Sequence, residues 1–250
     1  MKSSNNLSLR HKLSGTIACV ALLFAAMPTA WSAEIGEAQA EAICKQAKKV
    51  PIPARDLPDK AYFSKDKNCN SIDYYDPAIG KPDFQKARWC AYVERKEDVG
   101  APMLQGPGVL AMLYANGQGV PRNIPLATRF ACEALSLAEL EAGLADLQER
   151  SKTAQPTPFK TCDHASSALS ANECALHEID NHKLLREAQW KTMTARWSEA
   201  QKKAFWHLVA VSGKWFDQAE LEYSTGAAPM WNSHWQMLEG EKNGNRFRDC

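Results

Sequence analysis

Residues 109–121 constrain the fold most strongly, because they predict two helices joined by a tight turn. Small and apolar residues fill the first half of this stretch, which runs into Gly117 and Gly119. Glycine tolerates the positive φ angles that a tight helix C-terminus requires, so these two residues indicate the end of a helix. Pro121 cannot continue that helix, and Asn123 can cap the next one. A helical hairpin is therefore expected here.

An earlier segment, residues 74–89, follows the same order of residue types. It passes from a pair of tyrosines through Gly80 to Ala87, and Ala87 lies 40 positions before Ala127. The repetition predicts two related helical units.

Apolar residues at helical spacing predict further helices. We expect one helix over residues 34–49, ended by prolines, and another over residues 84–96. The two helices of the hairpin should cover residues 106–116 and 124–149. Residues 151–161 lose the helical period and contain two prolines, which predicts a linker.

Two long helices are expected after Cys174, divided at Ser198. Ser198 and Gln201 have the spacing of a capping box, in which each side chain bonds to the other residue's backbone amide. On the second helix, mostly apolar residues recur at steps of three and four, so they form a stripe along one face that another helix must cover. Large side chains of the first helix are the expected partners of this stripe. An antiparallel helical hairpin follows from this pattern. The stripe is Phe205, Leu208, Ser212, Trp215 and Ala219, and the expected partners are Trp190, Met193 and Trp197.

The first 33 residues predict a secretory signal peptide. They carry Lys2, Arg10 and Lys12 but no acidic residue, and then the apolar run of residues 16–27 with small residues after it. That run is shorter than the roughly 20 residues that span a bilayer. No second apolar stretch of membrane length follows. The protein is therefore expected in the periplasm or secreted, and not membrane-spanning.

The charge balance argues against nucleic acid as a partner. Without the first 33 residues the chain keeps 27 basic and 29 acidic side chains, a net charge of −2. Lys45, Lys48 and Lys49 form a local basic group, which we interpret as a solvated helix face.

Seven cysteines remain after the signal peptide, and in an exported protein they are candidates for disulfides. The odd number leaves Cys250 either unpaired or paired with another chain, so the oligomeric state stays open. The expected pairs are Cys162 with Cys174, Cys90 with Cys132, and Cys44 with Cys69.

The run from Leu113 to Pro121, followed by Ala127 and Phe130, resembles the Sel-type repeat, a relative of the tetratricopeptide repeat built from two antiparallel helices. The earlier unit matches in part, because it has Gly80 alone where the repeat has a Gly-x-Gly pair. Such repeats present a concave surface to peptides or proteins. The resemblance therefore implies a partner-binding groove, which would include Leu113, Tyr114, Arg122 and Arg129.

The C-terminal part resembles the LprI-type lysozyme-inhibitor family of exported bacterial proteins, in which two nearby cysteines precede a helical pair. The chain departs from the family pattern around Trp215, because Ser212 stands where the family commonly has glutamine and no cysteine follows until Cys250. The resemblance implies a helical module that binds a lysozyme or another glycan-active enzyme of the envelope, and inhibition of that partner is a separate expectation because of this departure. The matching positions are Cys162, Glu173, Cys174, Asp180, Trp190 and Trp215.

Together these patterns predict an all-α, disulfide-stabilised protein in which helical-hairpin repeats are followed by an antiparallel helical hairpin. The expected divisions are the signal peptide (1–33), an N-terminal helix with a proline-rich segment (34–68), the Sel-type module (69–150), the linker (151–161) and the LprI-like module with a loose tail (162–250).

Two groups of side chains have the types that metal or nucleophile chemistry needs. Cys174, His177 and His182 do not make the closed set of four ligands that structural zinc requires. Asp163 and His164 are adjacent, and adjacent side chains seldom face one another. We therefore expect no metal site and no cofactor.

A further alternative is that paired carboxylates act as general acid and base in the hydrolysis of a glycan. An acidic helix face explains them more simply, so we expect a protein-binding protein and not an enzyme. An envelope scaffold that uses the repeat groove, and a glycan-active enzyme that uses Glu139 or Glu141, are the alternative functions. The carboxylates in question are Glu139, Glu141, Asp146 and Glu149.

Overall fold

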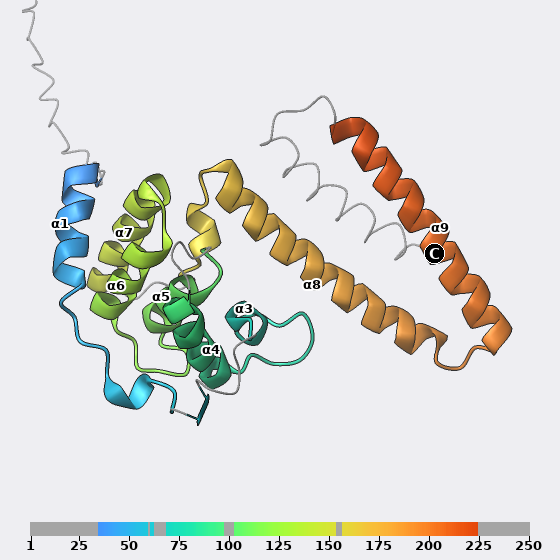
Figure 1. Cartoon of the computed structure of the whole chain (residues 1–250), viewed down its shortest axis with the longest axis horizontal. Helices are drawn as coiled ribbons and strands as arrows, with labels where there is room; N and C mark the ends of the chain where they lie inside the picture. The colour runs from blue at the N-terminus through green and yellow to red at the C-terminus, as the bar shows by residue number, and fades with distance from the viewer. Residues whose placement is uncertain (1–34, 60, 63–68, 98–102, 154–156, 225–250) are drawn as a thin grey trace, which may run out of the picture. The chain divides into compact units, whose positions relative to one another are not determined.

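The computed structural model describes residues 35–59, 61–62, 69–97, 103–153 and 157–224. These residues form α-helices and short 3₁₀ turns and no strand, which confirms the predicted all-α class. The expected signal peptide and C-terminal tail lie outside the described residues. The helices are α1 (Glu37–Ala47), α3 (Ser71–Tyr75), α4 (Phe84–Glu97), α5 (Gly106–Asn116), α6 (Ile124–Ala134), α7 (Leu137–Lys152), α8 (Ala168–Thr194) and α9 (Glu199–Ser224), and the 3₁₀ turns are Ala54–Asp56 and Thr161–His164 (Figure 1).

Helices α3 to α7 pack in chain order, each against the next, and α3 also contacts α5. The first helix, α1, packs on α6 and α7, which follow it by more than 70 residues in the sequence (Figure 1). This return of α1 closes the hydrophobic core on the side that α6 and α7 form.

The centre of the core is α5, in which every residue from Gly106 to Ala115 is buried. A helix that is apolar on all sides must be surrounded by other elements. Because α5 contacts α3, α4 and α6, its neighbours supply that cover.

The turn between α5 and α6 follows the prediction. Gly117 and Gly119 have φ angles of 69° and 67°, and the Asn123 side chain accepts a hydrogen bond from the amide of Leu126. The Arg88 guanidinium donates to the carbonyl of Gly119 at 2.7 Å, so this turn is also joined to α4.

The two predicted helical units correspond to α3 with α4 and to α5 with α6. Ala87 and Ala127 occupy the fourth position of α4 and of α6, and both are fully buried. The 40-residue offset therefore relates residues with equivalent burial. The Sel-type resemblance itself stays a prediction.

The single helix expected over residues 124–149 is wrong, because the chain breaks into α6 and α7. Leu135 has an extended backbone and is buried, and Ser136 precedes the first residue of α7. The sequence carried a signal for this break, since Ser136 and Glu139 have the spacing of a capping box. In the structure, however, the Glu139 side chain accepts hydrogen bonds from Ser167 and Ser170, before and within α8.

One residue of the expected linker, Phe159, anchors it to the core. Phe159 is fully buried, and Asn116 bonds to its backbone twice, accepting from the amide at 2.6 Å and donating to the carbonyl at 2.9 Å. Helix α7 extends to Lys152, and residues 154–156 lie outside the described residues. Helix α7 ends where Thr153 adopts an extended backbone, and the buried Phe159 ring holds the following chain on the core.

All six candidate cysteines form disulfides, but two of the three expected pairs are wrong. Cys162 bonds to Cys174 as predicted. Cys44 bonds to Cys132, across 88 residues, because α1 packs on α6. Cys69 bonds to Cys90 because it precedes α3, which packs on α4. Local spacing could not reveal these long-range neighbours. Cys250 lies outside the described residues.

Helix α9, the second helix of the C-terminal hairpin, begins with the predicted capping box. The amide of Ser198 donates to Gln201 Oε1 at 2.9 Å, and the amide of Gln201 donates to Ser198 Oγ at 3.3 Å. Phe205 makes edge-to-face ring contacts with Trp190 and Trp197, which confirms the antiparallel pairing.

The stripe of α9 that we expected to be covered is only partly buried. Phe205 and Ser212 are half-buried, whereas Leu208 is 59% exposed and Trp215 is also exposed. On α8, Met193 is exposed as well. Val209 is half-buried as well. The face of α9 that is covered is therefore rotated about the helix axis from the face that we expected. The side chain of Ala219 lies outside the described residues.

Candidate functional site

Two of the four residues predicted to bind a partner lie in the core. Leu113 is 0% exposed and Tyr114 is 1% exposed. The Tyr114 hydroxyl donates to Asp56 Oδ2 at 2.9 Å and lies 3.0 Å from the hydroxyl of Tyr92. Burial raises the pKa of Tyr114, with these hydrogen bonds adding to the effect. The prediction that Leu113 and Tyr114 line a binding groove is therefore wrong, because α5 is surrounded.

The two predicted arginines join elements of the fold. Arg122 donates from Nε to the Ala115 carbonyl at 3.1 Å and also donates to the carbonyl of Arg150. Arg129 donates to the Val50 carbonyl at 2.5 Å, and its Nε lies 3.6 Å from a carboxylate oxygen of Glu133. Arg122 connects α5 with α7, and Arg129 connects α6 with the segment after α1.

Two of the four carboxylates considered for glycan chemistry, Glu139 and Asp146, are held by partners within the fold. Glu139 is 1% exposed and accepts hydrogen bonds from the Ser167 amide at 2.9 Å and the Ser170 hydroxyl at 2.8 Å. Burial raises the pKa of Glu139, but these hydrogen bonds outweigh it and lower the pKa to about 2. Such a carboxylate cannot serve as a proton donor near neutral pH. Asp146 pairs with Arg150 at 2.8 Å.

Two of the three histidines considered in the sequence, His164 and His177, lie beside aspartates. His177 Nε2 lies 3.2 Å from Asp76 Oδ2, and this hydrogen bond lowers the pKa of Asp76. His164 Nε2 lies 3.3 Å from Asp146 Oδ2. Within the described part of the chain, no three His, Cys, Asp or Glu side chains are grouped to hold a metal ion.

Exposed apolar side chains gather on the C-terminal hairpin. Twelve large hydrophobic side chains are exposed among the described residues, and nine of these lie on α8 or α9. Leu208, Val211 and Trp215 recur at steps of three and four and share one face of α9. The nine are Leu169, Leu176, Leu184, Leu185 and Met193 on α8 with Trp206, Leu208, Val211 and Trp215 on α9.

A cavity of about 600 Å³ lies where α8 meets α3 and the start of α5. Its lining includes four carboxylates, against the single lysine Lys183 and His177. Glu173 is held there by the amides of Leu104 and Met103, which donate to its two oxygens at 2.8 and 3.0 Å. Burial raises the pKa of Glu173, and these amides offset only part of the effect. The carboxylates are Asp73, Glu173, Asp180 and Glu187.

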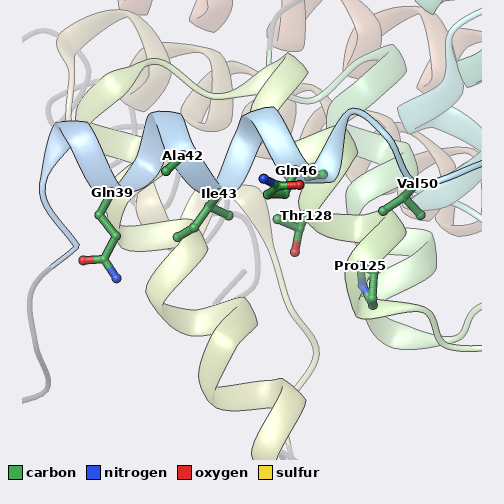
Figure 2. A pocket seen from close by; sticks show the side chains of 8 residues that line it. Gln39, Ala42, Ile43, Gln46, Val50, Pro125 and Thr128 are labelled. Carbon is green, nitrogen blue, oxygen red and sulfur yellow. The ribbon is translucent and has the colours of Figure 1, made fainter.

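A second hollow is an apolar groove between α1 and α6. Its volume is about 480 Å³, and Figure 2 shows Gln39 at one end of it with Val50 and Pro125 at the other. Ile43 of α1 and Thr128 of α6 also line it. We name this feature the α1–α6 groove.

Comparisons of the chain with protein-family models, with curated protein sequences and with solved structures found no match. The two family resemblances drawn from the sequence therefore stay predictions. The described residues contain no helix long and apolar enough to cross a membrane. The three disulfides are compatible with an extracytoplasmic location.

Sequence patterns missed two parts of this arrangement. The α1–α6 groove needs two helices that lie more than 70 residues apart in the sequence, so no local pattern could reveal it. The exposure of Leu208 and Met193 was also missed, because helical periodicity indicates which residues share a face and not which face a neighbouring helix covers.

Proposed function

We propose that this chain is an exported protein that binds another protein through the hairpin of α8 and α9. The observation that carries the proposal is that nine of the twelve large hydrophobic side chains exposed in the described part of the chain lie on these two helices. Large exposed apolar surfaces on a folded protein mark interaction sites, since leaving them in water is unfavourable. The predicted signal peptide and the disulfides support a periplasmic or secreted location.

The cavity beside α8 supports a more specific partner chemistry. Carboxylates outnumber cationic side chains in its lining, and Leu184 is exposed at its edge. A partner that inserts a lysine or arginine there would gain a charge-assisted contact next to apolar packing. Together with the LprI-type resemblance, these features favour a lysozyme or another glycan-active envelope enzyme as the partner. Binding, and not catalysis, is the proposed activity.

Calorimetric titration of the purified protein against lysozymes of several classes tests this proposal, together with a lytic assay of the same mixtures. We expect a complex that weakens as salt is added, because the charged contacts are screened. The double variant Leu208→Glu/Val211→Glu should bind at least about tenfold more weakly, since two carboxylates would be desolvated in the interface.

Ile79→Glu is the matched control, because Ile79 is 58% exposed but lies outside the hairpin. This variant should bind like the wild type. Unchanged binding by the Leu208→Glu/Val211→Glu variant contradicts the proposed surface. Full lytic activity of every lysozyme, with no heat of binding, contradicts a lysozyme as partner.

A further inference from the structure

The α1–α6 groove has an apolar floor on a part of the molecule that the proposed protein-binding hairpin does not use. Ala42, Ile43 and Val50 contribute from α1 and the residues after it, and Pro125 contributes from the first turn of α6 (Figure 2). These side chains offer no hydrogen-bonding groups. A ligand that fills the groove therefore needs an extended apolar part and few polar atoms to satisfy.

Polar side chains at the groove are uncharged amides and a hydroxyl. Gln39 and Gln46 come from α1, and Thr128 comes from α6 (Figure 2). The Thr128 hydroxyl already donates to the Ile124 carbonyl at 2.9 Å, one turn back in its own helix. No carboxylate belongs to the lining, so an anion in the groove meets no like charge there.

Cationic groups gather at the end of the groove marked by Val50. Lys49 Nζ donates to Oε1 of the groove-lining Gln46 at 3.0 Å, and an ammonium keeps two further N–H donors. Arg129 donates to the carbonyl of Val50 at 2.5 Å. Part of the arginine charge is balanced by Glu133, 3.6 Å away, whereas Lys49 forms no ion pair with a carboxylate of the described residues.

The opposite end of α1 has the opposite charge, since its first turns carry Glu37 and Glu41. The groove therefore has a direction, from acidic residues near Gln39 to basic residues near Val50. A ligand with one charged end would be oriented by this difference.

We propose that the α1–α6 groove binds a free single-chain anionic amphiphile, with its aliphatic chain along Ala42, Ile43 and Val50 and its carboxylate beside Lys49. An aliphatic chain matches the apolar floor because it has no polar groups to leave unpaired. The volume of about 480 Å³ lies within the range of small-ligand sites. The anionic head matches the ammonium of Lys49.

Calorimetric titration of the full chain with dodecanoate, below its micelle concentration, tests this proposal. Dodecanol and dodecyltrimethylammonium, which carry the same chain with a neutral and a cationic head, serve as comparison ligands. We expect dodecanoate to bind most tightly and the cationic ligand most weakly. Lys49→Ala should weaken dodecanoate binding by up to about fivefold, the upper end of the range for an exposed ion pair.

Ala42→Trp tests the position of the site, because a large side chain at this exposed groove residue would fill the space. This variant should lose dodecanoate binding while keeping the wild-type circular dichroism spectrum and melting temperature. Lys48→Ala is the matched control, since Lys48 is an exposed lysine of the same turn whose ammonium, unlike that of Lys49, is not bonded to a groove-lining side chain. It should bind like the wild type.

Three outcomes overturn the proposal. The first is a Ala42→Trp variant that stays folded and binds dodecanoate as tightly as the wild type. The second is equal affinity for the anionic and cationic ligands, which would indicate unselective adsorption to apolar surface. The third is no measurable binding of dodecanoate to the wild type. None of these results bears on the hairpin of α8 and α9, which is tested separately.

Discussion

At the scale of single residues, three carboxylates hold the connections between helices. Glu94 accepts from the Ser71 and Gly106 amides at 2.8 and 2.6 Å, at the starts of α3 and α5. Glu139 and Glu173 accept from amides before α8 and before α5. Backbone amides at helix starts lack partners within their own helix. A charged acceptor satisfies them and joins two elements at once.

Glu139→Gln should destabilise the protein by about 1 to 2 kcal/mol, the loss of charge assistance in these hydrogen bonds. The amide oxygen can still accept from Ser167 and Ser170, but the new NH₂ group would sit where Oε2 is buried without a partner. Urea unfolding at neutral pH measures the change. Glu141→Gln, on the same helix but less buried, is the control and should change stability little.

The same carboxylate predicts a dependence of stability on pH. The pKa of Glu139 in the folded protein is about 2, below the ordinary value of 4.5. A lowered folded-state pKa gives stability that is fully present above about pH 4.5 and is lost as the pH falls toward 2. The wild type should therefore lose more unfolding free energy between pH 5 and pH 2.5 than Glu139→Gln. Parallel losses in the two proteins would show that folding does not lower the pKa of Glu139.

At the scale of elements, the turn between α5 and α6 depends on the close approach of its backbone to α4. A Cβ atom at Gly119 would lie 2.7 Å from the Cβ of Phe84, and the φ angle of 67° is one that other residues rarely adopt. The glycine pattern predicted the turn. The packing against Phe84 was not predictable, because it joins α4 to a turn more than 30 residues later.

Gly119→Ala should destabilise the protein by about 2 to 4 kcal/mol, because a positive φ and an overpacked contact add together. Thermal unfolding followed by circular dichroism measures the effect. Gly213→Ala is the matched control, since no atom lies within 4 Å of a Cβ added in this part of α9. That change should be neutral or stabilise by up to about 1 kcal/mol, because alanine favours helix. A Gly119→Ala variant as stable as the wild type would contradict the tight approach.

At the scale of the whole molecule, disulfides connect segments that lie far apart in the sequence. Cys44–Cys132 joins α1 to α6 across 88 residues, whereas Cys162–Cys174 closes a loop of 12 residues at the start of α8. A cross-link restricts the unfolded chain more when it closes a longer loop. The bond between α1 and α6 also lies in the pair of helices that form the α1–α6 groove.

Removing Cys44–Cys132 with a double serine variant should cost about 4.5 kcal/mol, and removing Cys162–Cys174 about 3 kcal/mol, on the loop-closure estimate. Urea unfolding of both variants measures the difference. A non-reduced peptide digest analysed by mass spectrometry checks the pairing itself. Peptides that link Cys44 to Cys69, or Cys90 to Cys132, would contradict the structure.

The sequence by itself determined where most helices of this fold begin and end. Glycines, prolines and caps marked where helices begin and end, as at Gly117, Asn123 and Ser198, because each acts within a few residues of chain. Only the tertiary structure decided which cysteines meet, which face of α9 is covered and that Tyr114 is buried. Those outcomes depend on helices that meet across tens of residues, and local periodicity carries no information about which neighbour covers an apolar face. The α1–α6 groove belongs to this second kind, since it exists only because α1 returns to α6.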